Sequence, residues 1–312
     1  MNWNKLGLVF NTSKSDSWSQ SHAQVPFAFP LDEQTIRVFY ATRDQDSKSA
    51  VCFVDVDAQN PTTIKYQHDK PCFSAGKLGY CDDSGTMPSW FLRDENRILL
   101  YYTAWNSSKT ASYRLSIGLA ESTDNGLTFN RLFEGPVLDR GTFDPIWVGQ
   151  PCVRKEGNKW KMWYLSCVKI EYINNHPEPF YDVKYATSND GINWHKTGNV
   201  CIALDEFTDA IGRPSVIFED GIYKMYYSYR SANGYRNDVT KSYRLGYAES
   251  IDGIVWTRKD NEMNLKNSSE GWDSEMTTYP NVVQLNDRKL MFYNGNGFGA
   301  SGFGVAVDFK TK

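Results

Sequence analysis

The stretch Arg213-Pro-Ser-Val-Ile-Phe-Glu-Asp-Gly-Ile-Tyr-Lys-Met-Tyr-Tyr-Ser-Tyr-Arg230 decides the fold, because the chain contains five versions of it. Each version has a proline, an apolar segment, a turn rich in charged residues or glycine, and then aromatic residues. The prolines lie 62, 63, 63 and 66 residues apart, at Pro26, Pro88, Pro151, Pro214 and Pro280. A period this long and regular is typical of a repeat architecture.

Within the fourth unit, the sequence predicts four antiparallel strands. The first starts at Pro214, and Asp220-Gly221 is a hairpin signal because glycine accepts a positive φ without steric cost. Further strands are expected over residues 223–230 and 243–249 and from residue 255. The periodicity inside the unit is two rather than 3.6, which excludes a helical solenoid. Four-stranded units repeated around an axis are the blades of a propeller.

The aromatic residues of the fourth strands give an independent count of the units. They are spaced by 63, 63, 65 and 62 residues, at Trp3, Tyr66, Phe129, Trp194 and Trp256. The chain is therefore expected to begin with a fourth strand and to end with a third. We predict an all-β, five-bladed β-propeller over residues 1–312, a single domain in which the N-terminal strand completes the last blade and removes an exposed sheet edge.

The composition narrows the classes of ligand. Aromatic residues make up 15% of the 312 residues, which fits both an all-β fold and a carbohydrate ligand. The net charge is −3 and no basic run is present, which argues against nucleic acid and anionic membranes. No apolar run approaches the roughly 18 residues that span a membrane. The sequence does not indicate an oligomeric state.

The cysteines and the N-terminal sequence predict a cytoplasmic protein without a metal or cofactor. No apolar stretch follows Met1–Lys5, so we expect no signal peptide. The six cysteines lack CxxC spacing, and none lies at ligand spacing from the four histidines. We interpret them as buried, reduced thiols.

The segments just before the five prolines should line a pocket at one end of the propeller axis. Asp83, Asp209 and Glu275 each lie five residues before their proline, and Asp144 lies seven before its own. Carboxylates that converge from different repeats are what glycosidic bond cleavage needs, because one protonates the leaving oxygen and the other activates water or attacks carbon. They also raise one another's pKa. The alternative is that they cap turns or form ion pairs with groups such as Arg213.

Other side chains near the prolines are candidates for holding a ligand. Arg213 directly precedes its proline and could bind a carboxylate or phosphate. Arg43 and Arg230 follow the second strands of two units and could equally form salt bridges between blades. His22 is either a ligand-binding or a structural residue. The candidate substrate-binding set is His22, Arg43, Asp83, Trp147, Gln150, Arg213, Arg230 and Tyr279.

The proline-led strands and the SxDGxxW-like hairpins resemble those of the five-bladed propellers of glycoside hydrolase families 43, 32 and 130. Ser122–Phe129 is also similar to the Asp-box of sialidases, a structural hairpin remote from the active site. In families 43 and 32 the catalytic acids stand one or two residues before the inner-strand proline. Here these positions hold Gln24 and Val25, Thr86 and Met87, Gly149 and Gln150, Gly212 and Arg213, and Thr278 and Tyr279. None of them is acidic, and the Asp-Pro-Arg pattern of family 130 is missing.

Three functions remain open from the sequence. In the first, the protein is a glycosidase-like hydrolase of a small glycan or activated sugar. Asp144, Asp209 and Glu275 are then the catalytic carboxylates, and His22, Gln150, Arg213 and Tyr279 position the sugar. In the second, it is a non-catalytic carbohydrate-binding propeller of a glycan-assembly pathway. In the third, it is a phosphorylase in which Arg213 and His22 hold phosphate. The ligand is a glycan, a sugar phosphate or a nucleotide sugar.

Overall fold

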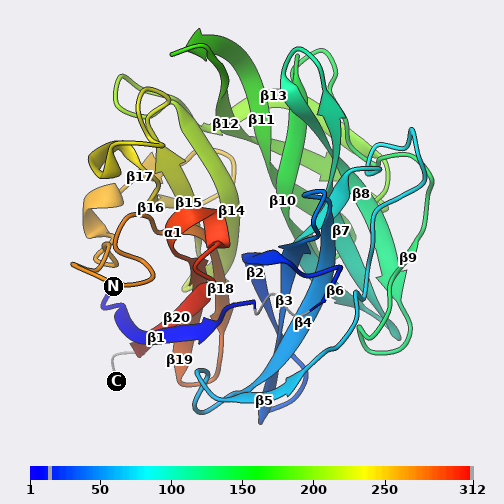
Figure 1. Cartoon of the computed structure of the whole chain (residues 1–312), viewed down its shortest axis with the longest axis vertical. Helices are drawn as coiled ribbons and strands as arrows, with labels where there is room; N and C mark the ends of the chain where they lie inside the picture. The colour runs from blue at the N-terminus through cyan, green and yellow to red at the C-terminus, as the bar shows by residue number, and fades with distance from the viewer. Residues whose placement is uncertain (13–15, 310–312) are drawn as a thin grey trace.

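The computed structural model describes residues 1–12 and 16–309, and these are built mainly of β-strands (Figure 1). Antiparallel pairing joins the strands in groups of four, here called units and numbered along the chain. Unit one holds β2 (Ser21–Pro30), β3 (Thr35–Arg43), β4 (Ser49–Asp57) and β5 (Ile64–Gln67), and unit two holds β6 (Gly85–Asp94), β7 (Arg97–Ser108), β8 (Ser112–Ser122) and β9 (Asn130–Arg131). Unit three holds β10 (Trp147–Glu156), β11 (Lys159–Ile173), β12 (His176–Ser188) and β13 (Trp194–Ile202), and unit four holds β14 (Ala210–Glu219), β15 (Ile222–Arg230), β16 (Arg244–Ser250) and β17 (Thr257–Arg258).

The last unit joins the two ends of the described chain. It consists of β18 (Thr278–Gln284), β19 (Arg288–Asn294), β20 (Phe303–Phe309) and the N-terminal strand β1 (Asn4–Phe10). β1 pairs antiparallel with β20, with Lys5 opposite Ala306. The prediction that the N-terminal strand completes the last unit is therefore confirmed.

The first strand of each unit packs against the first strand of the next. The contacts run from β2 to β6, β10, β14 and β18, and β18 packs against β2 (Figure 1). Polar side chains accept hydrogen bonds from backbone N–H groups across these junctions: Asn281 Oδ1 from Ala28 at 2.8 Å, and Ser215 Oγ from Val282 at 2.9 Å. These bonds satisfy buried donors where neighbouring inner strands form no ladder.

The prolines do not begin the inner strands, as the sequence analysis expected, but lie inside them. β14, for example, begins four residues before Pro214. The pairing register shifts at each proline, as between Gly212 and Ser215. Proline has no N–H to donate to a ladder, so a β-bulge is the place within a strand where it costs least.

The Ser-x-Asp-Gly turns form hydrogen bonds with the neighbouring units. In unit three, Ser188 Oγ donates to Asp190 at 2.9 Å and accepts from the Gly191 N–H, which fixes the turn. The Gly191 carbonyl then accepts a hydrogen bond from Tyr101 of unit two at 2.8 Å. Apolar contacts reinforce the junctions: the rings of Phe39 and Phe91, from units one and two, stack with centroids 4.0 Å apart.

In the described part of the chain, helical structure is confined to three short segments: η1 (Val239–Lys241), η2 (Asp260–Glu262) and α1 (Asn296–Gly299). α1 is irregular, because Gly297 and Phe298 have φ of 63° and 59°. In residues 1–12 and 16–309, no helix has the length and apolar character needed to cross a membrane.

Candidate functional site

The residue before the proline has left-handed backbone geometry in four of the inner strands. φ is 56° at Val25, 47° at Gln150, 56° at Arg213 and 53° at Tyr279, whereas Met87 does not share this geometry. A non-glycine residue in this region costs of the order of 1–3 kcal/mol and persists only where surrounding contacts hold it. Strain repeated at one level of the fold identifies the candidate site, here called the axial layer: these residues before the prolines together with His22, Arg43 and Arg230 beside them.

Side chains of the preceding unit hold this strained backbone in place. The Thr103 hydroxyl accepts a hydrogen bond from the Gln150 N–H at 2.8 Å, and the Ser228 hydroxyl accepts one from the Tyr279 N–H at 2.8 Å. Asn294 Oδ1 does the same for the Val25 N–H at 2.7 Å. The bulges are thus fixed from outside, so the axial layer is preorganised.

Arg213 reaches across the axis from unit four. Its guanidinium donates to the Ser89 carbonyl of unit two and, at 3.2 Å, to the Pro26 carbonyl of unit one. The side chain is 1% exposed, and its Nε has no hydrogen-bond partner. Burial lowers the pKa of Arg213 to about 10, so the group is still charged at neutral pH.

Arg43 lies beside the axis with His22, and it begins a series of side-chain hydrogen bonds. Its Nη2 donates to Gln24 Oε1 at 2.9 Å, and Gln24 Nε2 donates to the sulfur of Met87 at 3.2 Å. Burial, and then the positive charge of Arg43, lower the pKa of His22 to about 4, so the imidazole is neutral at pH 7. Arg43, His22 and Met87 are half-buried, so this part of the layer reaches the surface.

Arg230 lies among tyrosines next to Tyr279. Its Nε donates to the Tyr243 hydroxyl at 3.2 Å, and its Nη2 donates to the Pro179 carbonyl at 3.1 Å. The Tyr235 ring lies 3.9 Å from the Arg230 guanidinium, and the Tyr243 and Tyr279 rings are 6.3 Å apart. Arg230 thus lies in a buried group of tyrosines, and within residues 1–12 and 16–309 it forms no salt bridge.

Trp147 and Gln150 differ in their access to a ligand. Trp147 is 1% exposed and packs between Tyr113 and Tyr181, so its ring faces are covered by protein. Gln150 is half-buried, and a Cβ added at Gly212 would lie 2.8 Å from its Oε1. Gln150 therefore extends over the neighbouring inner strand, where a ligand's hydroxyl groups could reach it.

Asp144 belongs to a structural arrangement that recurs in several units. It is fully buried, pairs with Lys196 at 2.8 Å and accepts a hydrogen bond from Tyr164 at 3.3 Å. Three other units have an acid, a tyrosine and a cation in the same arrangement. They are Asp82 with Tyr102 and Arg131, Asp260 with Tyr227 and Arg258, and Asp273 with Tyr293 and Lys5. We call these four groups the acid–tyrosine–cation triads.

The three acids at the fifth position before a proline are bound to nearby loops. Asp209 Oδ2 accepts hydrogen bonds from the Ala232 N–H at 2.6 Å and the Ser231 hydroxyl at 3.2 Å. Asp83 accepts from the Gly79 N–H at 3.0 Å. Glu275 is exposed, and its backbone rather than its carboxylate binds Asn296. The contacts of these three acids link none of them to Arg213, Gln150 or Tyr279.

Asp182 is a perturbed carboxyl group that the sequence analysis missed. It is buried on β12, and its Oδ1 has no hydrogen-bond partner. Burial raises the pKa of Asp182 to about 6, with Lys184 opposing the shift and Asp144 adding to it. Nothing in the sequence distinguished Asp182, because consecutive residues such as Tyr181 and Asp182 face opposite sides of any strand.

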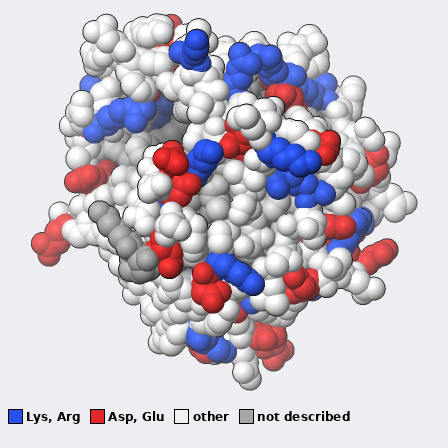
Figure 2. Space-filling view, turned by 45° about the vertical axis from the view of Figure 1, so that its right-hand side comes forward, with Lys and Arg blue, Asp and Glu red and all other residues white. Residues whose placement is uncertain are grey.

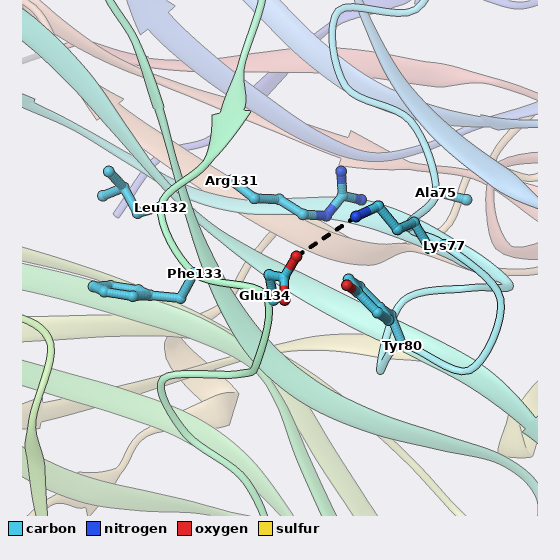
Figure 3. A pocket seen from close by; sticks show the side chains of 8 residues that line it. Ala75, Lys77, Tyr80, Arg131, Leu132, Phe133 and Glu134 are labelled. Atoms are coloured by element: carbon cyan, nitrogen blue, oxygen red, sulfur yellow. Dashed lines mark ion pairs between the residues drawn. The ribbon is translucent and has the colours of Figure 1, made fainter.

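A separate cavity of about 320 Å³ lies at the outer side of unit two (Figure 3). Lys77 and Glu134 face one another across it at 3.5 Å, and both side chains are about three-quarters exposed, at 76% and 77%. Arg131, which also lines it, is engaged by Asp82. The cavity contains no residue of the axial layer. Across the described part of the chain, no group of three or more His, Cys, Asp or Glu could hold a metal ion.

Comparison with known proteins identifies close relatives. No protein-family model matches the chain. The uncharacterized protein Rv1502 of Mycobacterium tuberculosis (strain ATCC 25618 / H37Rv) is 32% identical over 308 residues, which cover 98% of this chain and 99% of Rv1502. The chain belongs to the Rv1502 family. MT1551 of Mycobacterium tuberculosis (strain CDC 1551 / Oshkosh) matches to the same extent.

Solved structures show which fold this chain shares. A glycosyl hydrolase from Bacteroides ovatus has a TM-score of 0.73 at 15% identity, covering 100% of this chain and 94% of that one. A structure from the GH130 family of mannoside phosphorylases has a TM-score of 0.68 at 16% identity, with 100% and 94% covered. The predicted resemblance to glycoside hydrolase propellers is therefore confirmed at the level of the fold.

Proposed function

We propose that this member of the Rv1502 family is a five-bladed β-propeller over residues 1–312, one domain, and that it binds a small glycan at the axial layer without hydrolysing it. The cyclic packing of the inner strands and the pairing of β1 with β20 support the blade count. The six cysteines are unpaired, which supports a cytoplasmic location.

The chemistry of the axial layer carries this proposal. Its strained positions present Gln150, Arg213 and Tyr279, and no carboxylate. Hydrolysis of a glycosidic bond needs two carboxyl groups on opposite sides of it, roughly 5–9 Å apart. Asp144 is already neutralised by Lys196 inside unit three, and Asp209 is hydrogen-bonded to a loop. Binding without hydrolysis accounts for this distribution of acids better than catalysis does.

The same layer has the groups that bind sugars. Tyr279 and Gln150 are half-buried, so each can contact a ligand while protein contacts hold it in position. Tyrosine combines a flat apolar face with a hydroxyl, and side-chain amides can donate and accept hydrogen bonds. The space-filling view shows a hollow left of its centre with Lys and Arg side chains along its upper edge (Figure 2). The GH130 neighbour, whose family acts on mannosides, supports a sugar as the ligand.

The test combines binding and turnover on the purified protein. We expect saturable binding of at least one glycan on an array, confirmed by calorimetry, and no cleavage of that glycan or of an aryl-glycoside panel. If the wild type cleaves a glycoside and both Asp209→Asn and Glu275→Gln abolish cleavage, the protein is a hydrolase and the proposal is wrong. Release of a sugar 1-phosphate only when inorganic phosphate is added would instead show a phosphorylase.

A further inference from the structure

Arg43, Arg213 and Arg230 lie in the axial layer, and none of them pairs with a carboxylate within the described residues. Burial raises the pKa of Tyr279, its neighbours Tyr243 and Tyr113 raise it further, and the charges of Arg43 and Arg230 act in the opposite direction. Arg213 interacts with the same tyrosine. The contacts group the same residues: Tyr243 accepts from Arg230 Nε at 3.2 Å and its ring lies 6.3 Å from that of Tyr279, while Arg213 and Arg43 donate to Pro26 and Gln24 of the same strand, β2.

The partners of these arginines are neutral. Arg43 binds the Gln24 amide, Arg213 binds backbone carbonyls, and Arg230 binds carbonyls and the Tyr243 hydroxyl. Within residues 1–12 and 16–309, no carboxylate oxygen lies within 4 Å of any of the three side-chain cations. Glu178, on the β12 hairpin next to Tyr235, is occupied by Arg236 at 3.1 Å.

A buried charge without a counterion is costly, because the interior does not replace the hydration that the ion loses. Arg213 and Arg230 are 1% and 2% exposed, so water screens them little. The protein as a whole carries a net charge of −3, so this local positive charge does not follow from its composition. The half-buried side of the layer, at Arg43, Gln150 and Tyr279, is where an external anion can reach this field.

We propose that the glycan bound at the axial layer is anionic, with a carboxylate or phosphate group that contacts Arg43 and is stabilised by the charges of Arg213 and Arg230 beneath it. This inference rests on the proposed function and specifies its substrate class. The guanidinium of Arg43 presents several donors to an oxyanion, and Gln150 and Tyr279 remain for the sugar ring.

The experiment uses an array of neutral glycans, their uronate-containing counterparts and phosphorylated sugars, followed by calorimetry on the strongest probe. We expect binding only to anionic probes, and an affinity loss of at least tenfold in Arg43→Gln and in Arg230→Gln. Arg154→Gln is the matched control: Arg154 lies on inner strand β10 but pairs with Glu156, and its variant should bind as wild type does. Circular dichroism and melting curves establish whether each variant is folded. If Arg230→Gln does not fold, Arg43→Gln still tests the proposal, because the side chain of Arg43 is only half-buried.

Each outcome is decisive. Preference for uronates identifies the anion as a carboxylate, and preference for sugar phosphates identifies it as phosphate. Equal binding of neutral and anionic counterparts, or unchanged affinity in Arg43→Gln, overturns the anionic ligand but leaves glycan binding intact. No binding to any glycan overturns this inference together with the proposed function.

Discussion

Charged residues are arranged in opposite ways in two regions of this propeller-like fold. In the acid–tyrosine–cation triads, each acid has a cation and a tyrosine hydroxyl, as Asp144 has Lys196 and Tyr164. In the axial layer, the buried cations Arg213 and Arg230 have only neutral partners. The acids Asp82, Asp144 and Asp273 are as buried as these two arginines, so burial of the charge does not explain the difference. The acids of the triads pair with cations of the same chain, whereas the cations of the axial layer are left for a charged ligand to pair with.

The largest effect is expected from breaking a triad. Asp144→Ala leaves the buried Lys184 and the half-buried Lys196 without their acid and removes the acceptor of Tyr164, so we expect a loss of about 3–5 kcal/mol in the free energy of unfolding. Urea unfolding followed by fluorescence measures it. As a control, Glu134→Ala removes the exposed partner of Lys77 and should leave stability unchanged. A similar, small change in both variants would contradict the structural role of the triad.

Asp182 sharpens the comparison, because this acid lies near the Asp144 triad but is itself incompletely paired. Its pKa is raised to about 6, so between the unfolded value near 4 and this value the folded protein binds more protons than the unfolded chain. Its protonated form thus contributes stability below pH 4 that is lost as the pH rises through 6. We expect Asp182→Asn to stabilise the protein by about 2–3 kcal/mol at pH 7.5 and hardly at all at pH 4. Equal melting temperatures of variant and wild type at pH 7.5 would show that Asp182 is ionised without cost.

The smallest effect on stability is expected in the axial layer. Arg43→Gln removes one of three neighbouring cations, which should raise stability, and one hydrogen bond to Gln24, whose loss should lower it. We expect a change within about 1 kcal/mol, measured by the same urea titration. A destabilisation as large as that of Asp144→Ala would mean that Arg43 holds the fold, and the comparison of the two regions would then fail.

The sequence predicts the fold better than the site, for a physical reason. The intervals between prolines and between aromatic residues report strand positions, and the pairing of β1 with β20 follows from them. What the interval does not report is the bulge at each proline, which moves the start of the inner strand upstream. The pre-proline residues, including Gln150, Arg213 and Tyr279, are therefore recognisable from sequence as a set, although their strained geometry is not.

The candidate acids show where spacing misleads. Asp144 lies seven residues before its proline, and so does Asp273, whose contacts with Tyr293 and Lys5 match those of Asp144. This offset of seven is shared by these two triad acids and is readable in the sequence, but Asp82 lies six residues before Pro88 and Asp260 lies twenty before Pro280, so spacing alone does not identify a triad acid. The catalytic roles of Asp144, Asp209 and Glu275 stay predictions, and the geometry favours none of them. Tyr181 and Tyr243 lie 62 residues apart, which matches the repeat interval. This spacing indicates equivalent positions in two units, and both tyrosines belong to the aromatic group around Arg230.

The central claim is that an intact anionic glycan completes the charge of the axial layer. A crystal structure of the protein with its tightest-binding glycan tests this most directly. The account predicts an uncleaved ligand whose carboxylate or phosphate oxygens lie within hydrogen-bonding distance of Arg43, above Arg213 and Arg230. A ligand in the outer cavity between Lys77 and Glu134, or a cleaved sugar beside Asp209 or Glu275, would contradict it.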